Sequence, residues 1–136
     1  MLTRGRRAVE SLEAIITLPF AMLVVMMIVT FGFAIYAQQA VQNAANYGAR
    51  VGATAQSCRS CVAYTTAKET VERSFVRNPR VEILAPGGVV GSTLRIRVSG
   101  QTPNLMGPLL AFASGGAVDG GPIKVSADAT FRAEGW

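Results

Sequence analysis

The stretch AIITLPFAMLVVMMIVTFGFAIYA, Ala14 to Ala37, decides the fold because it carries no charged side chain over 24 residues. As a helix at roughly 1.5 Å per residue it would be about 36 Å long, enough to cross a bilayer core of about 30 Å. The competing interpretation is a cleaved signal peptide, whose apolar core usually has only about 7–15 residues. The run also continues into a helix-compatible stretch, QQAVQNAANYGAR. The sequence therefore predicts a retained transmembrane helix over residues 14–37.

Charged residues flank the apolar run unequally. Three arginines lie just before it: Arg4, Arg6 and Arg7. The next basic residue is Arg50, 13 positions after the run ends. Because positive charges near a span stay on the cytoplasmic side, we expect the N-terminus in the cytoplasm. Residues 1–13 are then a cytoplasmic basic leader, and residues 38–136 form a periplasmic or extracellular domain.

Composition argues against several classes of function. The formal net charge is +5, but the basic residues beyond the leader are scattered. Nucleic-acid binding favours a basic stripe interleaved with aromatic residues, and none is visible, so we expect no nucleic-acid partner. The chain has no histidine, which removes the commonest general base and the commonest metal ligand. We therefore expect no enzyme, no cofactor and no metal site.

Small residues recur every fourth position after the apolar run. They are Ala40, Ala44, Gly48 and Gly52. A four-residue step keeps them on one helix face, where small side chains let another element approach closely. The spacing leaves two partners open, the helix of another subunit or the protein's own sheet.

The remaining patterns predict a small α+β domain. A second helix is expected over Cys61–Val76, because apolar residues recur there at four-residue steps. Alternating apolar and polar residues predict three strands, at Arg80–Leu84, Thr93–Ser99 and Ile123–Arg132. We expect these strands to form a short antiparallel sheet with one face covered by helix.

An apolar segment separates the last two strands. It contains Leu105, Met106, Leu109, Leu110 and Phe112. We expect it to cap the core, and the alternative is contact with a partner or with the membrane surface.

The only cysteines, Cys58 and Cys61, form the motif CRSC. Haem attachment needs a histidine after the second cysteine, where Val62 stands, and structural zinc needs four ligands. In an oxidising compartment, a local disulfide that holds the turn is the favoured interpretation. A thiol redox function is the alternative.

A basic leader, a long apolar helix and a small outward α+β domain together have the layout of a pilin. The segments LEAIITLPF and FGFAIYAQQAVQNAANYGARVGA resemble the TadE-like family, the pilin-like minor subunits (pseudopilins) of tight-adherence pili. The family pattern is carried by residues within Tyr36–Arg50: Gln39, Ala40, Asn43, Ala44, Ala45, Gly48, Ala49 and Arg50. The resemblance implies a pilin-like fold in the bacterial inner membrane, in contact with membrane lipid.

The resemblance also implies trimming by a prepilin peptidase, which cuts after glycine and leaves a glutamate fifth after the cut. Cleavage between Gly5 and Arg6 would make Glu10 the fifth residue. The family's six-residue spacing to Pro19 instead selects Glu13, which is fifth after a cut between Ala8 and Val9. The family's second acidic residue is replaced by Thr30. Both registers stay open, as does an uncleaved chain.

In the family, the glutamate neutralises the N-terminal amine of a neighbouring subunit during assembly. The resemblance therefore assigns Glu13 or Glu10 to subunit assembly. The alternative is that both glutamates merely lie among the interfacial arginines. The implied partners are other pilin or pseudopilin subunits, the pilus assembly platform and the prepilin peptidase.

Three functions follow from these patterns. The first is a membrane-anchored pseudopilin subunit for assembly of a tight-adherence, type IV-like pilus or a related secretion machinery, with a route into a surface pilus. The second is a generic single-pass envelope domain that binds a protein partner. The third is a membrane thiol oxidoreductase that uses the CxxC cysteines.

Overall fold

The computed structural model describes the backbone of residues 3–134 and the side chains of residues 13–134. This part of the chain divides into two compact units. One, called here the anchor unit, comprises the chain up to Gly32 together with Leu105–Gly120. The other, called the head, comprises Phe33–Asn104 and the chain from Gly121 onward.

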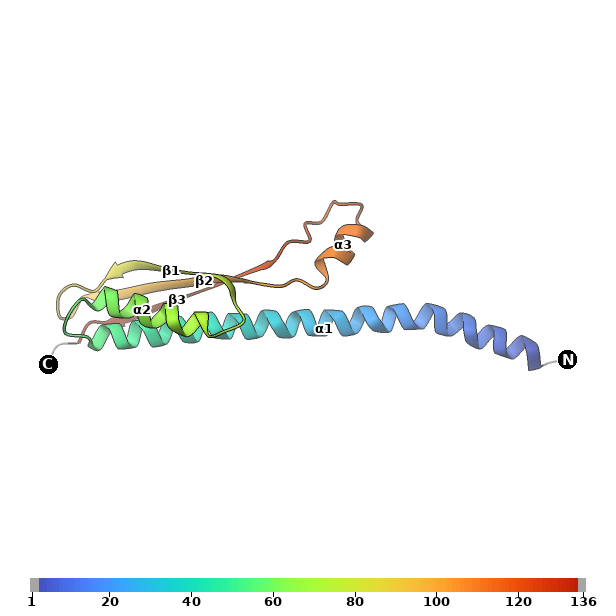
Figure 1. Ribbon diagram of the computed structural model, residues 1–136, viewed down its shortest axis with the longest axis horizontal. Helices are drawn as coiled ribbons and strands as arrows, with labels where there is room; N and C mark the ends of the chain where they lie inside the picture. The colour runs from blue at the N-terminus through green and yellow to red at the C-terminus, as the bar shows by residue number, and fades with distance from the viewer. Residues whose placement is uncertain (1–2, 135–136) are drawn as a thin grey trace. The chain divides into compact units, whose positions relative to one another are not determined.

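Three helices and three strands make up the described chain (Figure 1). In order they are α1 (Thr3–Thr54), α2 (Arg59–Glu72), β1 (Arg77–Pro86), β2 (Thr93–Thr102), α3 (Gly107–Ala113) and β3 (Ile123–Arg132). The predicted α+β class is confirmed, with a long N-terminal apolar helix, a second helix and a short antiparallel sheet. The second helix ends four residues earlier than its apolar periodicity predicted, because the backbone turns at Ser74, whose amide donates to Val71 O at 3.0 Å.

The sheet has the strand order β1-β2-β3, and both pairs are antiparallel. Strands β2 and β3 pair without interruption from Thr93 opposite Arg132 to Thr102 opposite Ile123. Strand β1 is less regular, with register shifts between Arg77 and Arg80 and between Ile83 and Ala85. Strands β1 and β2 are longer than their alternating patterns predicted, because backbone pairing extends into polar and proline-containing residues, whereas β3 has the predicted bounds.

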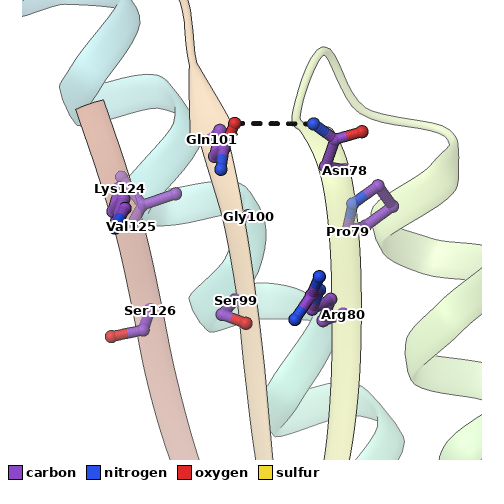
Figure 2. Close-up of a pocket in the computed structure, with 9 residues that line it drawn as sticks. All are labelled: Asn78, Pro79, Arg80, Ser99, Gly100, Gln101, Lys124, Val125 and Ser126. Carbon is purple, nitrogen blue, oxygen red and sulfur yellow. Dashed lines mark hydrogen bonds between the residues drawn. The ribbon is translucent and has the colours of Figure 1, made fainter. Parts of the chain in front are cut away.

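The core of the head lies between the helices and one face of the sheet. Figures 1 and 2 show α2 and the C-terminal half of α1 on the same side of the strands. The fully buried side chains of β2 are Leu94, Ile96 and Val98, which follow the period-two alternation of a half-buried strand. Opposite them lie the buried residues of the helices: Val41, Ala44, Ala45, Ala49, Ala53, Ala63, Ala67 and Val71. The helices contribute mainly alanine, so the backbones can approach closely.

In the anchor unit, α1 runs through Pro19 without interruption. The short helix α3 begins at Gly107, which lies so close to Gly120 in the following loop that a side chain at Gly107 would collide with the Gly120 carbonyl. The prediction that the apolar segment caps the core is wrong. Leu105, Leu109, Leu110 and Phe112 are exposed, and although Met106 is buried, none of the five belongs to the hydrophobic core cluster of the described chain.

Candidate functional site

The N-terminal half of α1 presents its apolar side chains outward. Among the described residues, one helix is long and apolar enough to cross a membrane, over Glu13–Thr54, and only 6% of its most apolar window is buried. Leu18 and Phe20 are exposed by 72% and 70%. A helix that is apolar all round and uncovered by its own chain requires an apolar environment, which a bilayer supplies.

Polar groups inside this apolar segment are satisfied within the helix. The Thr17 hydroxyl donates to the Glu13 carbonyl at 2.7 Å, and the Thr30 hydroxyl donates to the Met26 carbonyl at 2.8 Å. Such bonds to the preceding turn lower the cost of a hydroxyl in a lipid-facing helix. Thr30, at the position of the family's second acidic residue, therefore needs no partner subunit to satisfy its side chain.

The residues proposed for processing and assembly lie at the start of α1. The backbone is helical from Thr3. The side chains of Gly5, Arg6, Ala8, Val9 and Glu10 lie outside the described residues. Glu13 is described, and its side chain is exposed at the beginning of the apolar segment. Its carboxylate is thus accessible to another chain.

The small-residue stripe of α1 packs within the head. A side-chain carbon at Gly48 would lie 2.6 Å from Ala67 Cβ, and one at Gly52 would lie 2.5 Å from Ala63 Cβ. Ala44 is fully buried and Ala40 is partly buried against the same core. The structure therefore places α2, with Leu94 of β2 close to Gly52, against this face. The sequence offered another subunit or the sheet as partners and did not identify α2.

A polar stripe on the other face of α1, formed by Gln39, Asn43 and Arg50, was not predicted from the sequence. Gln39, Asn43 and Arg50 belong to the family pattern, yet their side chains are exposed. Steps of four and seven residues place them on one side of a helix. The family pattern thus divides into small residues that hold the head and polar residues that face outward. The step sizes were the signal that could have identified this stripe.

The turn between α1 and α2 is closed covalently. A disulfide joins Cys58 to Cys61, whose Cα atoms are 5.3 Å apart, which confirms the local disulfide favoured for an oxidising compartment. Cys58 adopts a left-handed backbone conformation with φ of 25°, which non-glycine residues rarely adopt. Next to it, Arg59 donates to the carbonyls of Gly88 and Glu134 at 3.1 and 3.2 Å. This turn therefore fixes the start of α2 to the end of the sheet.

The face of the sheet away from the helices carries an ion cluster. Arg97 donates two hydrogen bonds to the Asp128 carboxylate, at 2.7 and 2.9 Å, and Arg95 donates one at 2.9 Å. These bonds, chiefly those from Arg97, lower the pKa of Asp128 from 3.8 to about 2. Arg95 and Arg97 share a face because they alternate along β2, but their pairing with Asp128 depends on strand register.

In the described chain, a long apolar helix continues into a small α+β head, which is the fold of a pilin-like protein with a membrane anchor. A model of the TadE-like protein family matches residues 9–50, which confirms the resemblance seen in the sequence. The matched residues all lie in α1, so the head beyond Arg50 is outside the match. No curated protein and no solved structure matches the chain.

Proposed function

We propose that the protein is a membrane-anchored pseudopilin subunit that takes part in assembling a tight-adherence, type IV-like pilus or a related secretion machinery. The observation that carries this proposal is the coincidence of the family match with α1. Within that match, α1 exposes an apolar segment and then a polar stripe. The family is structural, which supports a role in assembly over a role in catalysis.

The proposed location is the bacterial inner membrane. Residues 1–13 form the cytoplasmic leader, residues 14–37 cross the bilayer, and residues 38–136 lie in the periplasm. The arginines before the apolar segment favour this direction of insertion. The disulfide supports it, because such bonds persist in oxidising compartments.

Processing of the leader is a separate step of the proposal. A prepilin peptidase would cut between Gly5 and Arg6 or between Ala8 and Val9. The exposed Glu13, or Glu10, would then pair with the N-terminal amine of a neighbouring subunit. A carboxylate at a membrane edge is costly to desolvate unless a cation compensates it, so such a pair stabilises the assembled state.

The mature N-terminus distinguishes the two registers. The intact mass of protein from membranes, with and without the host's peptidase, is the measurement. A peptidase-dependent start at Arg6 selects Glu10 as the fifth residue, and a start at Val9 selects Glu13. A start at Met1 in both strains overturns the processing step and leaves a permanent anchor.

Cross-linking in cells tests the assembly role. A photoreactive amino acid is placed at Asn43, on the polar stripe, and as a control at Lys68, which is exposed on α2. We expect adducts with a second copy, another pilin subunit or the assembly platform at Asn43, and several-fold fewer at Lys68. Adducts at Asn43 formed only with envelope proteins unrelated to pili would instead support the generic anchored domain. Equal labelling of pilus components at both sites would contradict a role for the stripe.

A further inference from the structure

An aromatic patch surrounds the point where the apolar segment enters the head. Phe33 and Tyr36 come from α1, and Phe75 comes from the turn after α2. The rings of Tyr36 and Phe75 have centroids 6.3 Å apart. The three residues line a pocket of about 100 Å³, together with Arg77 and others. Phe75 is far from the apolar segment in sequence, and its large apolar side chain is 80% exposed. This position favours contact with an apolar partner.

The sheet end beside this patch is basic. The register places Arg77 opposite Gln101 and Gln101 opposite Lys124. Residues 77–80, 99–103 and 123–126 contain three cations and no carboxylate. The cations are Arg77, Arg80 and Lys124. This end of the head therefore has a local positive charge with no acidic residue among these segments to balance it.

A pocket of about 760 Å³ opens on this end of the sheet (Figure 2). Figure 2 shows Arg80 on β1 and Lys124 on β3, with Ser99 and Gln101 of β2 between them. Asn78 Nδ2 donates to Gln101 Oε1 at 3.4 Å across the rim. The guanidinium and ammonium groups of Arg80 and Lys124, with hydroxyl and amide groups between them, are groups of the kind that bind phosphate oxygens.

The aromatic patch and the basic pocket both lie beside the end of the apolar segment. Gln38, the residue directly after Ala37, donates from Nε2 to the carbonyl of Ser126, which lines the basic pocket, at 3.0 Å. Tyr36 contacts Phe75 directly. From Glu13 to Tyr36, α1 rises by about 35 Å, so a bilayer entered at Glu13 ends near Tyr36.

We propose that this basal surface docks the head onto anionic phospholipid headgroups of the membrane that α1 crosses. The basal surface comprises Phe33, Tyr36, Phe75, Arg77, Arg80 and Lys124. The aromatic rings occupy the interface, as aromatic belts do, and the cations bind lipid phosphates. Lipid is the favoured occupant because the surface continues directly from the membrane segment and has the complementary charge. The inference rests on the membrane anchoring in the proposed function.

Quenching by brominated lipid tests the docking. The full-length protein, with its sole tryptophan removed by Trp136→Phe, is placed in nanodiscs that contain anionic phosphatidylglycerol. Three separate variants introduce a tryptophan: Phe75→Trp, Phe20→Trp and Val89→Trp. Val89 is the matched control, since it is 75% exposed in the β1–β2 turn at the other end of the sheet. We expect brominated lipid to quench position 75 at least twofold more than position 89.

Each outcome has one meaning. Quenching at position 20 but equal quenching at 75 and 89 overturns the docking and leaves the anchor intact. Absence of quenching at position 20 overturns the anchor itself. Protection of position 75 from both brominated lipid and aqueous iodide would show that a second protein chain covers the patch, which also overturns the proposal.

The dependence of quenching on phosphatidylglycerol content tests whether the basal cations bind anionic lipid. In the Phe75→Trp protein, Arg80→Gln with Lys124→Gln removes two basal charges, and Lys68→Gln with Arg132→Gln removes two charges elsewhere in the head. Two cations near an anionic surface shift such an equilibrium by about 30-fold. We expect the first pair to abolish the rise in quenching with phosphatidylglycerol content, and the control pair to retain it. Equal effects of the two pairs would overturn specific binding at the pocket.

Discussion

The two halves of α1 contain the same kinds of residue in opposite surroundings. Val25, in the apolar segment, is 59% exposed, whereas Val41, in the head, is fully buried. Gly32 has open space around it, whereas Gly52 contacts α2. The helix is continuous, so its conformation does not distinguish the halves. The difference lies in what covers each half: α2 and the sheet for the second half and, as we propose, lipid for the first.

An aspartate introduced into each half of α1 should produce the largest effects, and these effects should differ between the two halves. Val41→Asp buries an uncompensated charge, which costs about 3–5 kcal/mol and is comparable with the whole stability of a small domain. We expect the head to lose its near-ultraviolet circular dichroism in detergent micelles. Val25→Asp should leave the folded head unchanged there.

In cells, Val25→Asp should have the larger effect of the two substitutions. An aspartate near the centre of a span costs about 2.5–3.5 kcal/mol of insertion free energy. Val25→Asp should therefore reduce the membrane-bound fraction, measured by carbonate extraction. If Val25→Asp unfolds the head in micelles as severely as Val41→Asp does, the two halves are not independent.

Substitution of one glycine in each half of α1 tests the same comparison with a smaller change in the free energy of unfolding. Gly52→Leu brings side-chain atoms against Ala63 and against the Arg59 carbonyl, which a Cβ would already approach to 2.9 Å. Overpacking of this kind costs about 1–3 kcal/mol. The melting temperature of the head should fall by roughly 4–8 °C for each kcal/mol. Gly32→Leu is the control, and it should leave the melting temperature of the head unchanged.

The disulfide belongs to the head half alone. Cys58→Ser with Cys61→Ser opens a short loop, for which chain entropy predicts a loss of about 2 kcal/mol. Chemical denaturation of the oxidised wild type, the reduced wild type and the double variant is the measurement, and the last two should agree. Full pilus assembly by the double variant would exclude a required thiol redox function. Loss of assembly without loss of folding would favour that function.

The smallest effect concerns the outer face of the sheet. Because folding lowers the pKa of Asp128 from 3.8 to about 2, the ionised carboxylate stabilises the head above pH 4. That contribution is lost as pH falls from about 4 to 2. Asp128→Asn should therefore lower the melting temperature slightly at pH 6 and have no effect near pH 2. An equal loss at both pH values would show that the side chain acts by packing rather than by charge.

The fold was largely predictable because its signals are periodic. An uncharged run of 24 residues, a four-residue step of small residues and three alternating segments were enough to identify the helix, the packing face and the strands. The apolar segment around α3 was misassigned, because composition shows that residues avoid water but not what covers them. Phe112 is 89% exposed despite its chemistry.

The candidate site was only partly predictable. The small residues and the cysteines are recognisable from spacing. The Asp128 cluster and the basal surface are not, because they join strands through a register that local patterns do not determine. Phe75 illustrates the limit: its spacing from Val71 predicted a buried helix face, and the chain turns before reaching it.

The change of environment along α1 is most directly tested by a tryptophan scan in the Trp136→Phe protein. Single tryptophans at Phe20, Ile28, Tyr36, Asn43 and Tyr47 are each quenched by brominated lipid and by aqueous acrylamide in nanodiscs. We predict strong lipid quenching at positions 20 and 28, a crossover near position 36, and acrylamide quenching alone at positions 43 and 47. Acrylamide quenching at positions 20 and 28, or lipid quenching that continues to position 47, would contradict a helix that leaves the bilayer where the head begins.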